Sequence, residues 1–312
     1  MHMLRNMIAL FLAAAAAAAT AESLPAEIAR DRRMTVNVEI NESGPHAFVV
    51  DTGAERTIIA EDLATQLKLP DSAPVQMQSV SGLSRVRTVR IDRLRLSKLL
   101  VSDIQAPALA EKNLGAAGIL GIDTLHDRRI ILDFRKGLLT VLPGGQAPES
   151  RDVATDEIVV RARNRFGRLV VTDADANGQK VHVIIDTGAE VTLGNSALEA
   201  RLARRNRDFI AGTVDIMAVT GGIVTARKAM LKGVRLGGIR IGNLPVAISD
   251  AHIFDALGLR GKPALLLGMD ALAHFDRVSI DFAQRKVRFL TPGMQPPVAD
   301  SASAAAAAGP RG

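Results

Sequence analysis

Short apolar segments separated by turn-forming residues recur along most of this chain. The segment Met34–Ile40 alternates apolar and polar positions, as a half-buried strand does, and a turn signal follows it at residues 41–44. Residues 61–69 predict a short helix, and an Asn177-Gly178 pair predicts a tight hairpin turn. Further strand patterns cover residues 47–50, 89–91, 94–96, 158–161, 169–172 and 181–185. The pattern therefore predicts a mostly β fold with short helices.

One pentapeptide, Asp-Thr-Gly-Ala-Glu, occurs at residues 51–55 and again at 186–190. A single Asp-Thr-Gly would be weak evidence, since a Thr-Gly pair after a strand is commonly just a turn. Here each copy ends an apolar strand pattern, and a threonine follows two positions later, at Thr57 or Thr192. Each half then continues with an apolar Gly-x-Asp segment, ending at 123 or 270, and a strand that ends in Asp-Phe. The same order of elements in both halves indicates an internal duplication.

This arrangement resembles the clan of aspartic proteases that contains the retroviral (retropepsin) and pepsin-like enzymes. It most resembles the bacterial retropepsin-like members that have two lobes in one chain, and the resemblance covers most of residues 33–292. It implies two retropepsin-like β-barrel lobes related by a pseudo-twofold duplication. We expect a signal peptide over 1–21, an N-terminal lobe over 22–142, a linker over 143–156, a C-terminal lobe over 157–293 and a disordered tail over 294–312.

The resemblance implies that Asp51 and Asp186, one from each lobe, form a catalytic dyad. Two carboxylates that lie close together cannot both ionise readily, so they share a proton and their pKa values split. The ionised partner would take a proton from water while the protonated partner donates to the carbonyl oxygen of the peptide. Which aspartate carries the proton is a property of the pair and stays unassigned.

Residues next to this dyad would support the two catalytic loops. Gly53 and Gly188 let backbone amides approach the carboxylates. By resemblance, Thr52 and Thr187 cross-brace the loops through their hydroxyl groups, although a plain turn role for both stays open. The two segments at 119–121 and 266–268 would pack under the loops as structural support.

Two glycine-containing turns are candidates for the mobile hairpins, or flaps, that cover substrate in this family. One of them could equally be an ordinary surface hairpin. A pepsin-type flap carries a tyrosine, which this chain lacks, so the comparison favours retropepsin-like enzymes. The candidate residues are Val80, Ser81 and Gly82 in the first half and Thr220, Gly221 and Gly222 in the second.

The motifs also depart from their relatives. Ala54 and Ala189 stand where pepsin-like enzymes have a serine or threonine, so the ionised carboxylates receive fewer hydrogen bonds. Fewer donors should leave the dyad pKa values higher, and we predict an activity maximum at weakly acidic to near-neutral pH. Retroviral enzymes have an arginine directly after the supporting glycine, where this chain has apolar residues. The partners of Glu55 and Glu190 must therefore come from elsewhere, and Arg56 is too close in sequence to be a firm choice.

The second half is longer between its landmarks than the first. Asp51 and Gly121 are 70 residues apart, whereas Asp186 and Gly268 are 82 residues apart. The extra length is expected in residues 251–262. This loop could shape a cleft, but we expect it to decorate the surface, because surface loops tolerate insertions.

Composition narrows the classes of function. The 312 residues carry a formal charge of +6, contain neither Trp nor Tyr, and are 47% hydrophobic, which predicts aliphatic cores. The arginines are spread along both halves, so we expect solvated strand faces and no nucleic-acid partner. Cysteine is absent, and the chain has neither a His-Glu-x-x-His motif nor a Gly-Lys-Ser/Thr phosphate loop. We therefore expect no metal and no cofactor.

The N-terminus has the pattern of an export signal. Arg5 precedes an apolar stretch over residues 7–19, and Ala19-Thr20-Ala21 is a small-residue cleavage site. A periplasmic location in a Gram-negative bacterium is the preferred interpretation, with secretion as the alternative. The membrane is a partner only if this segment stays uncleaved, because it is short for a membrane span.

The sequence thus predicts an exported aspartic endopeptidase that acts on a protein or peptide substrate bound in extended form. Two motifs in one chain make a monomer sufficient. The alternative is an inactive module of the same fold that binds a peptide or protein. Two buried carboxylates argue against this alternative, because they are costly to bury and a binding groove has no need of them.

Overall fold

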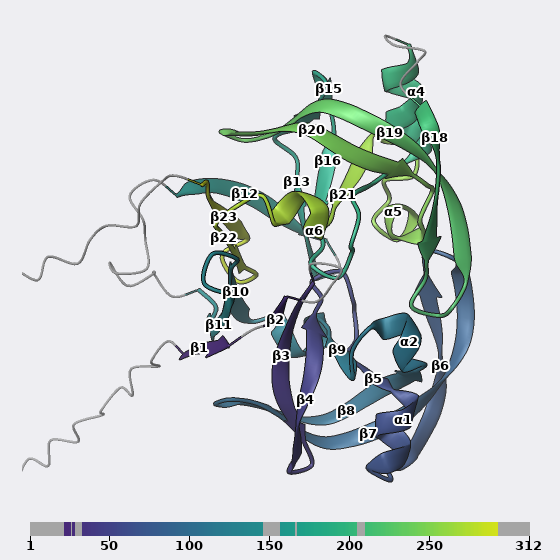
Figure 1. Cartoon of the computed structure of the whole chain (residues 1–312), viewed down its shortest axis with the longest axis vertical. Coiled ribbons are helices and arrows are strands. Elements are labelled where there is room, and N and C mark those ends of the chain that lie inside the picture. The colour runs from purple at the N-terminus through teal and green to yellow at the C-terminus, as the bar shows by residue number, and fades with distance from the viewer. Residues whose placement is uncertain are drawn as a thin grey trace, which may run out of the picture.

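The computed structural model describes residues 22–25, 27–28, 33–145, 157–165, 167–204 and 210–292 (Figure 1). The predicted signal peptide, the predicted tail and residues 146–156 of the predicted linker lie outside the described residues. No helix within the described ranges is long and apolar enough to cross a membrane.

The first lobe, in the lower half of Figure 1, is an eight-stranded sheet in the order β2-β3-β4-β9-β5-β8-β7-β6, with an additional β3–β7 pairing. Its strands are β2 (Glu27–Ile28), β3 (Met34–Ile40), β4 (Ser43–Val50), β5 (Ile58–Ala60), β6 (Asp71–Ser79), β7 (Gly82–Leu96), β8 (Leu99–Leu109) and β9 (Gly118–Leu120). Its helices are α1 (Glu61–Gln66), α2 (Glu111–Leu114) and α3 (Ile122–Leu125). Helix α1 is shorter than the predicted 61–69, because Lys68 has a left-handed φ of 52° that cannot continue a helix.

The second lobe, in the upper half of Figure 1, repeats this plan. Its strands are β13 (Arg168–Val171), β14 (Ala174–Ala176), β15 (Gln179–Lys180), β16 (His182–Ile185), β17 (Leu193–Gly194), β18 (Ile210–Met217), β19 (Ile223–Leu236), β20 (Ile239–Ile248) and β21 (Ala264–Leu267). Its helices are α4 (Ser196–Ala203), α5 (His252–Ala256) and α6 (Met269–Leu272). Asn177 and Gly178 join β14 to β15 with φ values of 49° and 75°, as the predicted hairpin turn requires.

A shared sheet joins the two lobes on one side of the molecule. Its strands, in spatial order, are β1 (Glu22–Pro25), β11 (Leu138–Pro143), β10 (Arg128–Asp133), β22 (Arg277–Asp281), β23 (Lys286–Leu290) and β12 (Ile158–Arg165). The lobes meet where β10 pairs antiparallel with β22, and Ile130 lies opposite Ile280 in this register. Both isoleucines are at most 1% exposed, so the junction is part of the hydrophobic core.

The duplication is explicit in the strand pairing. In the first lobe β4 runs parallel to β9, which is antiparallel to β5, and in the second β16 runs parallel to β21, which is antiparallel to β17. Val50 lies opposite Leu120, and Ile185 lies opposite Leu267. Each Asp-Thr-Gly-Ala-Glu motif therefore begins at the same point of its lobe. The predicted mostly β fold with two duplicated lobes is confirmed.

Aliphatic side chains fill the core, as the composition predicts. Strands β4 and β16 end in continuous apolar runs because they are buried on both faces: Val49, Val50, Ile184 and Ile185 are at most 1% exposed. The strands therefore carry the two motifs to the centre of the molecule on rigid supports.

Candidate active site

Asp51 and Asp186 occupy equivalent positions directly after β4 and β16. The amide of Asp51 donates to Leu120 O at 3.0 Å, and that of Asp186 donates to Leu267 O at 3.1 Å. Oδ1 of Asp51 accepts hydrogen bonds from the next amides of its loop, those of residues 53 and 54, at 2.7 and 3.0 Å. Oδ1 of Asp186 accepts the equivalent bonds from residues 188 and 189, at 2.9 and 3.2 Å. The backbone thus holds both carboxylates in the same way.

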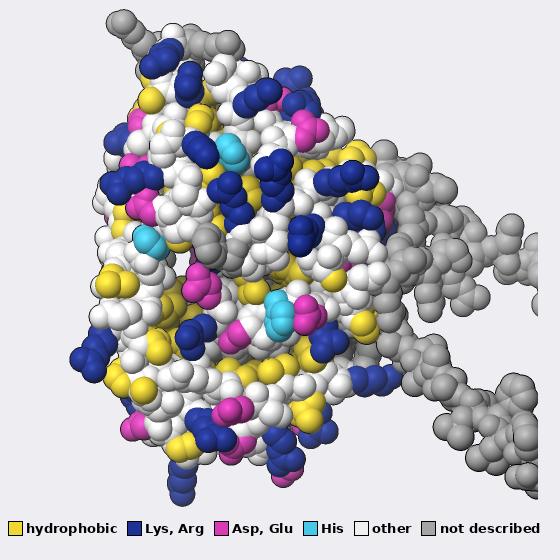
Figure 2. Space-filling view, turned by 180° about the vertical axis from the view of Figure 1, so that it is seen from behind, with side chains coloured by type: hydrophobic (Ala, Val, Ile, Leu, Met, Phe, Trp, Pro, Cys, Tyr) yellow, Lys and Arg dark blue, Asp and Glu magenta, His cyan; other side chains and the backbone are white. Residues whose placement is uncertain are grey.

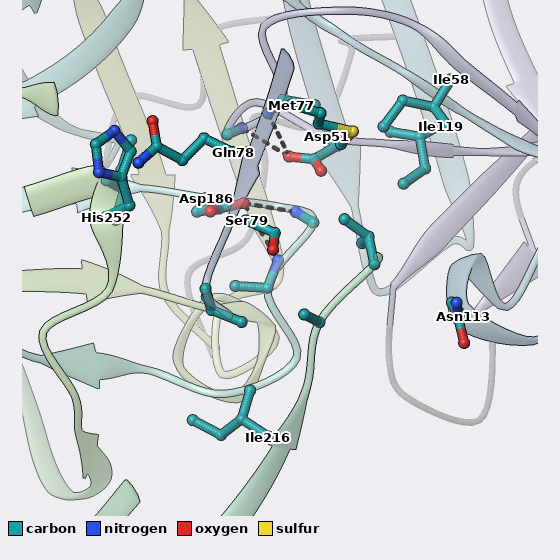
Figure 3. Close-up of a pocket in the computed structure, with 18 of the residues that line it drawn as sticks. Asp51, Ile58, Met77, Gln78, Ser79, Asn113, Ile119, Asp186, Ile216 and His252 are labelled. Carbon is teal, nitrogen blue, oxygen red and sulfur yellow. Dashed lines mark hydrogen bonds between the residues drawn. The ribbon is translucent and has the colours of Figure 1, made fainter. Parts of the chain in front are cut away.

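The two carboxyl groups lie near each other at the centre of the site (Figure 3), and each influences the pKa of the other. A Cβ atom on Gly53 would lie within 3.0 Å of the Asp186 carboxylate, and one on Gly188 would lie equally close to Asp51. Only glycine therefore allows each loop to pack on the carboxylate of the other lobe.

This environment raises the pKa of both acids. Burial, followed by the negative charge of Asp51, raises the pKa of Asp186 to about 8. Burial also raises the pKa of Asp51, and the hydrogen bond from the Gly53 amide only partly offsets this. The pair therefore holds a proton at neutral pH, which a general acid–base site requires.

Thr52 and Thr187 cross the boundary between the lobes. Thr52 Oγ1 donates to Ile185 O at 3.0 Å and accepts from the Thr187 amide at 3.2 Å. Thr187 Oγ1 donates to Val50 O at 2.6 Å and accepts from the Thr52 amide at 3.1 Å. Both threonines are buried. These four bonds fix the carbonyl groups directly before the two aspartates, so they fix the separation of the carboxylates.

A second acidic residue supports each loop from below. In the first lobe Asp123 accepts hydrogen bonds from the amide and the hydroxyl group of Thr57, at 2.9 and 2.7 Å. In the second lobe Asp270 accepts the same two bonds from Thr192, at 3.0 and 2.7 Å. Sequence reasoning noted both Gly-x-Asp segments but gave their aspartates no role. The signal was that each half has one such aspartate, two residues after its supporting glycine.

Each of the two loops is joined to the opposite lobe by one buried arginine. Arg168 donates to Gly53 O at 2.8 and 2.9 Å and to Glu55 at 3.0 Å. Arg33 lies 4.0 Å from Glu190 and donates to Leu114 O at 2.9 Å. These arginines are the partners that had to come from elsewhere in the sequence. Each lies 18 residues before the aspartate of its own lobe, a signal that sequence reasoning missed.

The structure places both flap candidates at hairpin tips that meet on the side away from the shared sheet (Figure 1). Val80 and Ser81 link β6 to β7, which begins at Gly82. Thr220, Gly221 and Gly222 lie in the turn between β18 and β19. Thr220 Oγ1 is 2.8 Å from Ser79 Oγ and 3.1 Å from Ser81 Oγ. The chain thus has two hairpins in contact, one from each lobe.

A cavity of about 590 Å³ lies between the dyad and these hairpins (Figure 3). Seen from behind, a hollow with apolar side chains inside it separates the lobes (Figure 2). Besides the two aspartates, the lining has charged side chains and many apolar ones, which include Ile58, Val75, Met77 and Ile119 from the first lobe and Leu193, Val214, Ile216 and Leu266 from the second. Among the described residues, no three acidic, histidine or cysteine side chains come together as a metal site would need.

The insertion at residues 251–262 also reaches this cavity. Its helix α5 contributes His252, Ile253 and Ala256 to the lining, and His252 lies beside Gln78 of the first hairpin (Figure 3). The expectation of surface decoration was wrong. Phe254 and Leu259 anchor the segment in the second-lobe core, at 1% and 0% exposure, so its first turn is held against the cleft.

Comparison with known families agrees with this architecture. A family described as gag-polyprotein putative aspartyl protease matches residues 36–127, and a family described as aspartyl protease matches residues 172–271. The first match contains Asp51 and the second contains Asp186. No curated protein matches the chain. With one aspartyl protease domain in each lobe, the chain belongs to the retropepsin-like aspartic proteases and carries both lobes in a single polypeptide.

Proposed function

We propose that this chain is an active aspartic endopeptidase that hydrolyses peptide bonds in extended polypeptide segments. The observation that carries the proposal is the close approach of two carboxyl groups, Asp186 buried and Asp51 half-buried, whose pKa values are both raised. A purely structural pair of acids would be costly here, because burial without a cation destabilises the charged form. Two acids that share a proton at neutral pH can act as a general acid and a general base in one reaction.

The reaction needs only these two groups and one water molecule. The ionised carboxylate removes a proton from the water while the oxygen of that water bonds to the peptide carbonyl carbon. The protonated carboxyl group donates its proton to the carbonyl oxygen, which gives a neutral diol. The C–N bond then breaks as one diol hydroxyl gives its proton to the ionised carboxylate. The other carboxyl group gives the proton that it took from water to the amine nitrogen. The dyad ends with one proton, as it began.

The cavity supports an apolar, extended substrate. Aliphatic side chains from both lobes surround the dyad, so apolar residues on either side of the scissile bond would bury surface there. The two hairpins cover the cavity and touch through hydroxyl groups at their tips. Substrate would enter when these tips separate, and their closure would exclude water from the site.

We also propose that the protein is exported and acts as a monomer in the periplasm or outside the cell. The support for export is the N-terminal sequence pattern of Arg5, the apolar stretch and the small-residue cleavage site. The support for a monomer is that one chain supplies both aspartates of the dyad.

The test compares cleavage of an unstructured protein by the wild-type chain and by the Asp51→Asn and Asp186→Asn variants. Asp127→Asn is the matched control, since this side chain is 79% exposed and outside the cavity lining. We expect both dyad variants to lose at least a thousand-fold in kcat, which is about 4 kcal/mol of transition-state stabilisation, while the control stays active. Equal cleavage by all four proteins would refute the proposal. Peptide binding without cleavage by the wild-type chain would favour the inactive module.

A further inference from the structure

The two ends of the cleft differ at one residue of otherwise identical loops. After the repeated pentapeptide, the first lobe has Arg56 where the second has Val191. Both residues line the cavity. Arg56 is exposed and takes part in no ion pair among the described residues, whereas Val191 is half-buried and packs on the second-lobe core. The pseudo-twofold symmetry of the site is therefore broken by a charge.

The structure shows which elements form each end. At the Arg56 end, Glu55 binds Arg168 of β13, and Arg165 of the adjacent β12 donates to Leu257 O directly after α5. At the Val191 end, Arg33 joins Glu190 to Leu114 O of α2, and α2 touches the tip of the second hairpin through Asn113 and Gly221. Each end thus combines one catalytic loop with a helix from the opposite lobe.

The charges at the two ends do not match. Glu55 and Glu190 are each neutralised by a buried arginine from the opposite lobe. The Val191 end has two further charges of opposite sign, Lys112 of α2 and Asp215 of the second hairpin. The equivalent position to Asp215 on the first hairpin is the neutral Gln76. Arg56 is therefore the charge left without an acidic counterpart at its end of the cavity.

We propose that Arg56 makes the cleft select polypeptides that carry an Asp or Glu side chain on one side of the apolar residues at the scissile bond. The inference rests on the proposed peptide hydrolysis for the reaction, and Arg56 determines on which side of the scissile bond the acidic residue binds. A guanidinium group pairs well with a carboxylate in planar geometry. Arg56 is exposed, so this pair would have the strength of a surface ion pair. The selected substrates are acidic and apolar, and their acidic residue lies on the same side of the cut each time.

The experiment uses matched peptides with a fixed apolar pair and with Glu or Gln placed at successive positions before or after it. Cleavage is measured with the wild-type chain, and binding is measured separately with the Asp186→Asn variant by fluorescence anisotropy. We expect a Glu:Gln preference of about two- to five-fold in kcat/KM, on one side only, which is the range of an exposed ion pair. Binding to Asp186→Asn should show the same one-sided preference.

The internal symmetry of the chain supplies the decisive variants. Arg56→Val should abolish the preference, and the exchange Arg56→Val/Val191→Arg should move it to the other side of the apolar pair. Arg87→Gln, at an exposed pair outside the cavity lining, is the control and should leave the preference in place. Circular dichroism verifies that each variant is folded. If the exchange variant does not fold, loss of the preference in Arg56→Val is a sufficient test.

The outcomes separate this inference from the proposed function. One-sided binding of Glu peptides without any cleavage would refute peptide hydrolysis and uphold the role of Arg56. Cleavage with no Glu preference, or with a preference that survives Arg56→Val, would refute the role of Arg56 and uphold hydrolysis.

Discussion

The dyad makes the stability of the folded chain depend on pH, and replacing both aspartates by asparagine should remove that dependence. Folding raises the pKa of Asp186 from 3.8 to about 8 and raises that of Asp51 as well. A carboxyl group with a raised pKa binds its proton more tightly in the folded state. Its contribution to the free energy of unfolding is therefore complete below pH 3.8 and is lost as the pH rises toward about 8.

The magnitude follows from the shift. One pKa unit corresponds to about 1.4 kcal/mol, so the rise of about four units at Asp186 corresponds to about 5 kcal/mol. Asparagine is neutral at every pH, and the other carboxyl groups titrate equally in both proteins. The stability of the wild-type chain minus that of Asp51→Asn/Asp186→Asn should therefore fall by at least about 5 kcal/mol between pH 4 and pH 8.5, because the raised pKa of Asp51 adds to the effect.

Urea unfolding followed by far-ultraviolet circular dichroism measures this difference, since the chain has no Trp or Tyr fluorescence. The single variant Asp186→Asn should retain a smaller slope, because only one acid with a raised pKa, Asp51, is left to titrate. Asp127→Asn, at an exposed site, should parallel the wild-type chain. If the double variant also paralleled the wild-type chain from pH 4 to pH 8.5, the two acids would not titrate as a buried pair.

Three further predictions concern the loops and hairpins. Thr187→Val removes two buried hydrogen bonds between the lobes and should lower the free energy of unfolding by about 2–4 kcal/mol. The exposed control Thr65→Val should change this free energy little, and equal urea midpoints for the two variants would contradict the prediction. Ala54→Ser adds a hydroxyl donor next to the ionised carboxylate, which lowers its pKa, so the acidic limb of the pH–rate profile should move down by about one pH unit. An unmoved limb would show that the hydroxyl group does not reach the dyad. Thr220→Val breaks the contacts between the hairpin tips and should raise KM about three-fold in steady-state assays, and an unchanged KM would mean that the tips do not hold substrate.

The repeat made the centre of the molecule predictable. Two identical pentapeptides after apolar strands require equivalent surroundings, and the structure gives Asp51 and Asp186 the same amide donors and the same parallel neighbour strand. The turn at Asn177 was also predictable, because it depends on only two adjacent residues. Local residue chemistry and the duplication were together sufficient to predict these two features.

Contacts between distant segments were harder to predict. Nothing in the neighbourhood of Arg168 indicates that its guanidinium group crosses to Gly53 and Glu55, because that contact exists only once both lobes have packed. The insertion was misplaced for a related reason. The tolerance of surface loops for insertions suggested a surface loop, whereas Phe254 and Leu259 are buried in the core and bring His252 to the cavity.

The arginines that cross between the lobes make each half dependent on the other. Without its neighbour, the first half would expose the edge of β10 and leave Gly53 O and the Thr52 hydroxyl group without the partners that they have here. The second half would lose the equivalent partners of Thr187. Neither half is therefore a self-sufficient folding unit. A chain nicked once between residues 146 and 156 should stay associated, and the two pieces should separate only as they unfold.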